Sequence, residues 1–191
     1  AQRILAANNI HDVQIEPVPG DLTDHYDPSA RILRLSQPVY ASRSIAAAGI
    51  AAHEVGHAIQ HAQGYAPLRF RSAWVPVANL GGGISMFVLM GAFMLGGAAT
   101  ATGQNLAAIG VLLFATTTVF TLITLPVEFD ASRRALATLE RGGLMPQEEL
   151  AGARKVLSAA ALTYLAAFIS SLLTLLYYLI RLGLIGGRRD D

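Results

Sequence analysis

The segment AAHEVGHAIQH, residues 51–61, holds three histidines and one glutamate within eleven residues. Histidine and glutamate are side chains that bind zinc and transfer protons near neutral pH. His53, Glu54 and His57 fit the pattern H-E-x-x-H, and on a helix two residues four apart lie on the same face. We therefore predict a helix whose two imidazoles reach one metal ion, with Glu54 beside them as the general base. The alternative is a structural pair of histidines with Glu54 in a surface ion pair.

Zinc suits this set of side chains, because neutral imidazole and carboxylate bind it well and a catalytic zinc keeps one position open for water. The ion lowers the pKa of that water, and Glu54 can then accept its proton. A catalytic zinc also needs a third protein ligand. His61 is in helical phase with His53, but it lies about 12 Å further along the axis, too far to share the ion. We interpret His61 as a residue that supports the site or as polar surface.

Glu128, in the segment LPVEFDASRRAL, is the first charged residue after a run of 56 residues without Asp, Glu, Lys or Arg. Such a run is long enough for two membrane crossings, since each needs about 20 apolar residues. Two crossings return the chain to the side it left, which brings Glu128 back to the depth of the His53 helix. A carboxylate at a membrane boundary is costly without a partner, and a metal ion would supply one. We predict that Glu128 is the third ligand; the alternative is a carboxylate at a helix N-terminus that pairs with Arg133 or Arg134.

The composition indicates an integral membrane protein. The chain has 191 residues, of which 53% are hydrophobic and 14% charged, and its mean hydropathy of +0.45 is high for a soluble domain. A net charge of +1 gives no field that would attract nucleic acid, and the lack of cysteine excludes disulfides and thiolate metal sites. Because the first residue is Ala rather than Met, we expect the chain to begin part-way into a longer gene product.

The spacing of charges predicts a mainly α membrane protein with three transmembrane helices and a small zincin-like metallopeptidase region. The spans must be helical, because lipid offers no hydrogen bonds to the backbone. Gly, Thr, Gln and Asn in GGAATATGQN, residues 96–105, predict the turn between the first two spans. The expected segments are a zincin-like region with short strands and the H-E-x-x-H helix at 1–71, a transmembrane hairpin at 72–127 with spans at about 74–99 and 106–125, a third-ligand helix and linker at 128–155, a third transmembrane helix at 156–181 and a polar tail at 182–191.

The polar N-terminal region contains strand and cap signals. Alternating apolar and polar residues predict short strands at 13–16, 22–25 and 31–35, the last two joined as a hairpin across YDPSA. A serine before IAAAGIAAHE predicts the N-cap of the next helix, and Gly64 predicts its end. We further predict that residues 31–35 form an edge strand beside the active-site helix, where backbone pairing would align an extended substrate.

Four segments in order, DHYDP…LRLS, AAHEVGHAIQH, PVEFDASRRAL and AALTYLAA, resemble the YugP-type neutral zinc membrane metallopeptidases over essentially the whole chain. The arrangement is more distantly similar to HtpX and CAAX-type membrane proteases. The resemblance implies a bacterial-type integral-membrane metallopeptidase in which His53, His57 and Glu128 bind one zinc ion and Glu54 is the catalytic base. In the related E-F-x-A-D pattern an Asp orients a ligand histidine. Ser132 stands at that position here, so Asp130 is considered as its substitute.

These observations predict a zinc endopeptidase that hydrolyses peptide bonds of membrane or membrane-proximal proteins. Its partners would be the lipid bilayer, a protein or peptide substrate and a membrane-protein assembly. One rival hypothesis is a non-catalytic scaffold subunit with a structural zinc, which would not need the base Glu54. The other is a metal transporter, which would need ionisable residues inside the spans. The side chains that could stabilise an oxyanion are Arg133, Arg134, Tyr164 and His25.

The Lys and Arg residues predict the orientation. Of the 14, eleven lie with the active site and only Arg181, Arg188 and Arg189 lie beyond the third span. Because positive charge favours the cytoplasmic side, we expect the active site in the cytoplasm and the tail GGRRDD outside.

Overall fold

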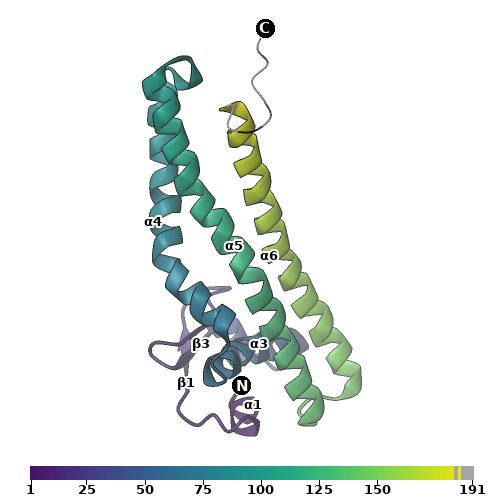
Figure 1. Cartoon of the computed structure of the whole chain (residues 1–191). Coiled ribbons are helices and arrows are strands. Elements are labelled where there is room, and N and C mark those ends of the chain that lie inside the picture. Colours follow the sequence, from purple (N-terminus) through teal and green to yellow (C-terminus); the bar gives the residue numbers. More distant parts are fainter. Residues whose placement is uncertain (183–184, 186–191) are drawn as a thin grey trace. The chain divides into compact units, whose positions relative to one another are not determined.

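The computed structural model describes residues 1–182 and residue 185, so most of the predicted polar tail lies outside the described residues. The chain is mainly helical, with one small sheet (Figure 1). It divides into two compact units. The first unit contains Ala1–Arg69 and Leu125–Thr163, and the second contains Phe70–Thr124 and Tyr164–Asp191.

The first unit is built from a three-stranded sheet and several helices. Its N-terminal elements are α1 (Gln2–Ala7), β1 (Gln14–Val18), β2 (His25–Asp27), β3 (Ile32–Ser36), α2 (Gln37–Ala41) and α3 (Ile45–Ala62). β2 and β3 pair antiparallel, which confirms the predicted hairpin. The second strand begins at His25 rather than Leu22, because Leu22 has a φ of 58°, a left-handed conformation that does not continue a strand.

The prediction of an edge strand at residues 31–35 is wrong. The strand order is β1-β3-β2, so β3 is the central strand and is paired on both sides. Leu33 and Leu35 on β3 are buried, with 0% and 4% of their surface exposed. Alternation along a strand reports which face is buried but not how many neighbours the strand has. The sheet edges belong to β1 and β2.

Helix α3 is the centre of the first unit's core. The Ser44 hydroxyl accepts a hydrogen bond from the Ala47 amide, and Gly64 has a φ of 63° just after the helix, as the cap signals predicted. Its buried apolar side chains share one cluster with α1, β3, α5 and α6, which includes Leu5, Leu33, Ala52, Val55, Ile59, Ala135, Leu139, Ala153 and Leu157. This packing holds the H-E-x-x-H segment in the interior of the unit.

Three long helices follow, namely α4 (Ala66–Met94), α5 (Ala101–Arg141) and α6 (Gln147–Arg181). Each is long and apolar enough to cross a membrane. The link between α4 and α5 is shorter than the predicted turn at 96–105, because the Thr100 hydroxyl accepts a hydrogen bond from the Gly103 amide and α5 begins at Ala101. α5 then continues through Pro126. Glu128 therefore lies inside a helix and not at its N-terminus, which excludes the alternative role predicted for it.

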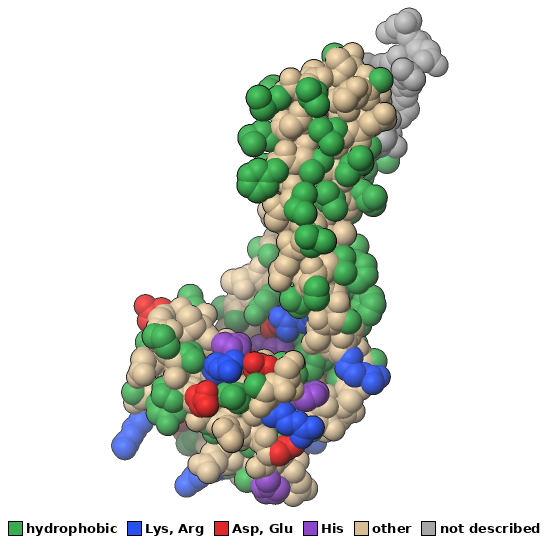
Figure 2. Space-filling model, turned by 90° about the vertical axis from the view of Figure 1, so that its left-hand side faces the viewer, with side chains coloured by type: hydrophobic (Ala, Val, Ile, Leu, Met, Phe, Trp, Pro, Cys, Tyr) green, Lys and Arg blue, Asp and Glu red, His purple; other side chains and the backbone are tan. Residues whose placement is uncertain are grey.

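The surface of the second unit is apolar. On the face shown in Figure 2, hydrophobic side chains cover the helices, and Phe87 and Leu112 are each 70% exposed. Polar contacts within the unit join one helix to the next. Trp74 donates from its indole nitrogen to the Thr116 carbonyl on α5 at 3.1 Å. A surface of this kind is suited to lipid contact, while the interhelical hydrogen bonds satisfy buried polar groups.

Candidate metal centre

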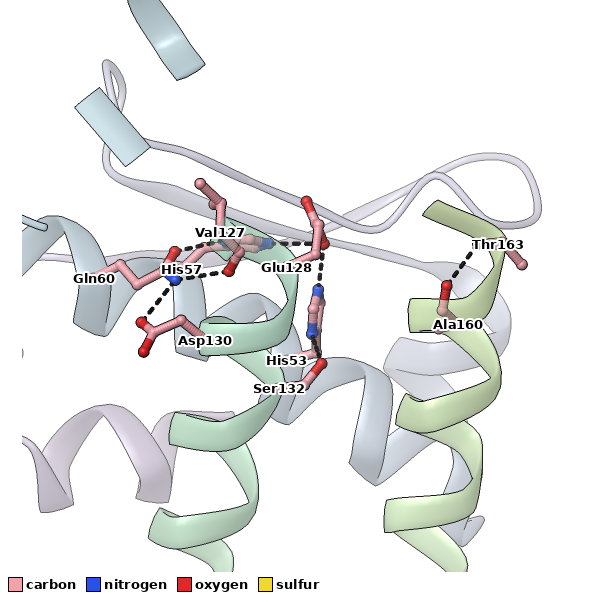
Figure 3. A network of polar contacts seen from close by, with 9 residues as sticks. All are labelled: His53, His57, Gln60, Val127, Glu128, Asp130, Ser132, Ala160 and Thr163. Atoms are coloured by element: carbon pink, nitrogen blue, oxygen red, sulfur yellow. Dashed lines mark hydrogen bonds and ion pairs between the residues drawn. The ribbon is translucent and has the colours of Figure 1, made fainter. Parts of the chain in front are cut away.

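Two helices bring the predicted ligands together. His53 and His57 lie one turn apart on α3, and Glu128 comes from α5 (Figure 3). Nε2 of His53 lies 3.0 Å from one carboxylate oxygen of Glu128, and Nε2 of His57 lies 3.6 Å from the same oxygen. One ligand atom from each residue lies within 4.8 Å of the others, and all three side chains are buried. The three residues therefore form a group that could hold a metal ion.

The group fits zinc. Zinc bonds of about 2.0–2.1 Å in a tetrahedron place two ligand atoms about 3.3 Å apart. The two nitrogen–oxygen separations, 3.0 and 3.6 Å, lie on either side of that value. The imidazole rings of His53 and His57 are nearly perpendicular, with an interplanar angle of 84°, so their Nε2 atoms approach the carboxylate from different directions. Two nitrogens and one oxygen are also donors that zinc prefers.

The Nδ1 nitrogen of each imidazole has its own hydrogen-bond partner. Nδ1 of His53 lies 3.0 Å from the hydroxyl oxygen of Ser132, and Nδ1 of His57 lies 3.0 Å from the side-chain oxygen of Gln60. Ser132 thus contacts a predicted ligand, His53, from the position where the related pattern has Asp. Asp130, the expected substitute, instead accepts a hydrogen bond from Gln60 at 3.0 Å.

Gln60 is the site residue that sequence reasoning did not find. It lies on α3 three residues after His57, close to the same helix face, and its side chain is fully buried. A polar residue one turn beyond a predicted ligand, close to the helix face that carries both histidines, is the signal that could have found it. Its partners on α5, however, are visible only in the folded chain.

Glu54 is buried next to His53 on α3, with 9% of its surface exposed. Burial raises the pKa of its carboxyl; the histidines His57 and His53 oppose this shift, while Glu128 and Asp24 add to it. A carboxyl with a raised pKa binds a proton more readily than an ordinary glutamate. Glu54 is therefore suited to accept a proton from a water molecule at the site.

The remaining predicted residues have other partners. Arg133 and Arg134 both pair with Asp130, and Arg134 also lies over the Tyr65 ring with its guanidinium carbon 5.3 Å from the ring centroid. These contacts place the two arginines around Asp130, one hydrogen bond beyond Gln60.

Two further histidines that were predicted to support the site, His25 at the start of β2 and His61 near the end of α3, have partners of their own. Nδ1 of His25 contacts the Thr23 carbonyl at 2.8 Å, and Nδ1 of His61 contacts the Tyr26 hydroxyl at 2.8 Å. Within residues 1–182, the metal-binding group contains neither of them. Tyr164 belongs to the second unit.

Residues 1–183 match a family model described as "Putative neutral zinc metallopeptidase", and the chain belongs to this family. Family membership and the three apolar helices define the chain's class as zinc metallopeptidases with membrane-spanning segments. Among individual proteins, the chain is 48% identical over 178 residues to the "Putative membrane protease YugP" of Bacillus subtilis (strain 168), a match that covers 93% of this chain and 76% of that protein. No solved structure matches the chain significantly.

Proposed function

We propose that this chain is an integral-membrane zinc endopeptidase that cleaves peptide bonds of membrane or membrane-proximal proteins. The observation that carries the proposal is the convergence of His53, His57 and Glu128 beside the buried carboxyl of Glu54. A structural zinc has no need of a base, whereas a hydrolytic one does. The family of the chain and the name of its relative support the same activity.

Each residue has a defined role in this proposal. His53, His57 and Glu128 hold one zinc ion, and Ser132 orients the His53 ring through the contact with Nδ1. When bound, zinc lowers the pKa of water and polarises a carbonyl group. Glu54 accepts the proton that the attacking water loses and delivers it to the nitrogen of the leaving amine. Its buried position keeps bulk water from competing for that proton.

We also propose that the site works on the cytoplasmic side. Two candidate spans separate His57 from Glu128 in the sequence, so both residues return to one side of the membrane. Eleven of the 14 Lys and Arg residues lie with them, which favours the cytoplasm. Substrates would then be proteins whose cleavage sites lie in or close to the inner face of the membrane.

A single substitution tests the activity. Glu54→Gln keeps the size of the side chain but removes the base, so hydrolysis of casein by the zinc-loaded, detergent-solubilised chain should fall about 10²–10⁴-fold. The zinc content should stay at that of the unmodified chain. Glu140→Gln, an exposed substitution at the end of α5, is the matched control and should leave hydrolysis unchanged. Equal hydrolysis by the Glu54→Gln variant, or a zinc-loaded chain that cleaves nothing, would contradict the proposal.

A further inference from the structure

Every polar atom of the Gln60 side chain is engaged. Gln60 is 0% exposed. Its amide nitrogen donates to the Val127 carbonyl at 2.8 Å and to the Asp130 carboxylate at 3.0 Å, and its amide oxygen lies 3.0 Å from Nδ1 of His57 (Figure 3). A buried amide with all three partners satisfied has one orientation and cannot turn without leaving polar groups unpaired.

The partners on α5 determine which end of the amide faces His57. The Val127 carbonyl can only accept a hydrogen bond. The Asp130 carboxylate pairs with Arg133 and Arg134, whose guanidinium groups are always charged, so it is ionised and also only accepts. The NH₂ group of Gln60 must therefore face α5, and its oxygen must face His57.

The orientation of the Gln60 amide determines the direction of its hydrogen bond with His57. An amide oxygen cannot donate, so Nδ1 of His57 must carry a hydrogen and donate it to Gln60. In a neutral imidazole the other nitrogen, Nε2, then has no hydrogen and presents its lone pair. That nitrogen is the one that lies 3.6 Å from Glu128, on the metal side of the ring.

His53 is held differently. Its Nδ1 contacts the Ser132 hydroxyl, which can either donate or accept a hydrogen bond. Ser132 therefore orients the His53 ring without determining which of its nitrogens carries the hydrogen. For His57 the hydrogen on Nδ1 follows from the contact with Gln60, whereas the Ser132 contact sets no such position for His53, whose Nε2 also lies 3.0 Å from the Glu128 carboxylate.

We propose that Gln60 is a positioning residue that locks His57 in the form with hydrogen on Nδ1, so that Nε2 is ready to bind the metal. A series of ion pairs and hydrogen bonds connects the guanidinium groups of Arg133 and Arg134, through Asp130 and Gln60, to the imidazole of His57. Because Gln60 also binds the carbonyl of Val127, the neighbour of Glu128, it joins the two ligand-bearing helices at the site. The purpose assigned to Gln60 rests on the proposed zinc function. The position of the hydrogen on His57 can be tested without it.

The first test reads the position of the hydrogen directly, beginning with the metal-free chain. Nitrogen-15 NMR of the detergent-solubilised full chain, labelled at histidine, reports whether each ring nitrogen carries a hydrogen, and His57→Ala assigns the signal. We expect a hydrogen on Nδ1 of His57 in the metal-free chain and, after zinc is added, the same hydrogen still in place. A His57 ring without hydrogen on Nδ1 would overturn the inference, even if the chain proved to be an active zinc peptidase.

The second test measures zinc affinity by competition with a chelator. Gln60→Met keeps the length of the side chain but removes the amide that contacts Nδ1 of His57. Zinc should then bind about 10–100-fold more weakly. Gln147→Met, an exposed position at the start of α6, is the matched control and should bind as the unmodified chain does. Unchanged affinity in a folded Gln60→Met variant would overturn the inference. An unmodified chain that binds no zinc would refute the proposed function and leave the NMR result to decide the role of Gln60.

Discussion

Gly56 allows α3 to approach α5 closely enough to form the metal-binding group, and Gly56→Ala should break it. A methyl group built on Gly56 would lie 2.9 Å from the carbonyl carbon of Ala131 and 3.1 Å from its Cα. Carbon atoms prefer a separation of about 3.5–4.0 Å. The neighbouring atoms are backbone and cannot rotate away, so the two helices must separate by about 0.6–1 Å.

That displacement is large for a metal site. Gly56 lies between His53 and His57, and Ala131 lies one turn after Glu128, so the separation would act on the contacts that join the ligands. Zinc–ligand distances tolerate a change of only about 0.2 Å. We expect zinc affinity to fall at least about tenfold, equivalent to about 1.4 kcal/mol. Overpacking should also lower the free energy of unfolding by about 1–3 kcal/mol, partly offset by up to about 1 kcal/mol because alanine favours a helix more than glycine does.

Gly49→Ala is the matched control on the same helix. A methyl group there would lie 3.7 Å from the nearest atoms of Ala153, which is an ordinary contact. The control should bind zinc as the unmodified chain does and should be as stable or slightly more stable. Zinc titration and thermal unfolding of both variants, with and without zinc, compare them. If Gly56→Ala matched Gly49→Ala in affinity and melting temperature, the reasoning about helix approach would be refuted.

Three further predictions concern the ligand set, the base and the orientation. Glu128→Gln should weaken zinc binding by more than tenfold in chelator competition, because an amide is a poorer zinc ligand than a carboxylate; binding as tight as that of the unmodified chain would remove Glu128 from the ligand set. Because only the ionised carboxyl accepts a proton, kcat should decline as the pH falls through the pKa of Glu54, which burial raises and a bound zinc ion would lower. Glu54→Asp should shift this acidic limb, and an unshifted profile would assign the limb to another group. Alkaline phosphatase fused after Asp191 should be active and green fluorescent protein at the same position dark, whereas the reverse pattern would place the site on the outer face.

The sequence carries much of the information about the site, because that information is local. The four-residue spacing of His53 and His57 makes them neighbours on any helix, and the cap signals at Ser44 and Gly64 set where that helix begins and ends. Glu128 stood out because it follows a long uncharged run. These features depend on helical periodicity and on the cost of burying charge, and both can be read without the fold.

Other features depend on contacts between distant segments. The role of Gln60 is set by Val127 and Asp130, which are 67 and 70 residues away in the sequence. The central place of β3 depends on β1, which pairs with it in parallel from the far side of the hairpin. Alternation in residues 31–35 could not show this pairing, because it is the same for a central and an edge strand with one buried face.

The length of α5 was also underestimated. The predicted span at 106–125 and the predicted third-ligand helix at 128–155 are parts of one helix, because α5 runs from Ala101 to Arg141 and includes Pro126. Proline removes one backbone donor, and a long apolar helix can tolerate that loss where neighbouring groups compensate. One continuous helix therefore carries both the second candidate span and Glu128.

Locating the metal ion is the decisive experiment for the proposed zinc site. Crystals of the zinc-loaded chain, measured on both sides of the zinc absorption edge, would locate the ion by its anomalous signal. We predict one peak about 2.0–2.2 Å from Nε2 of His53, Nε2 of His57 and a carboxylate oxygen of Glu128. A peak held by other residues, or no zinc peak at this group in a chain that still hydrolyses peptides, would contradict this prediction.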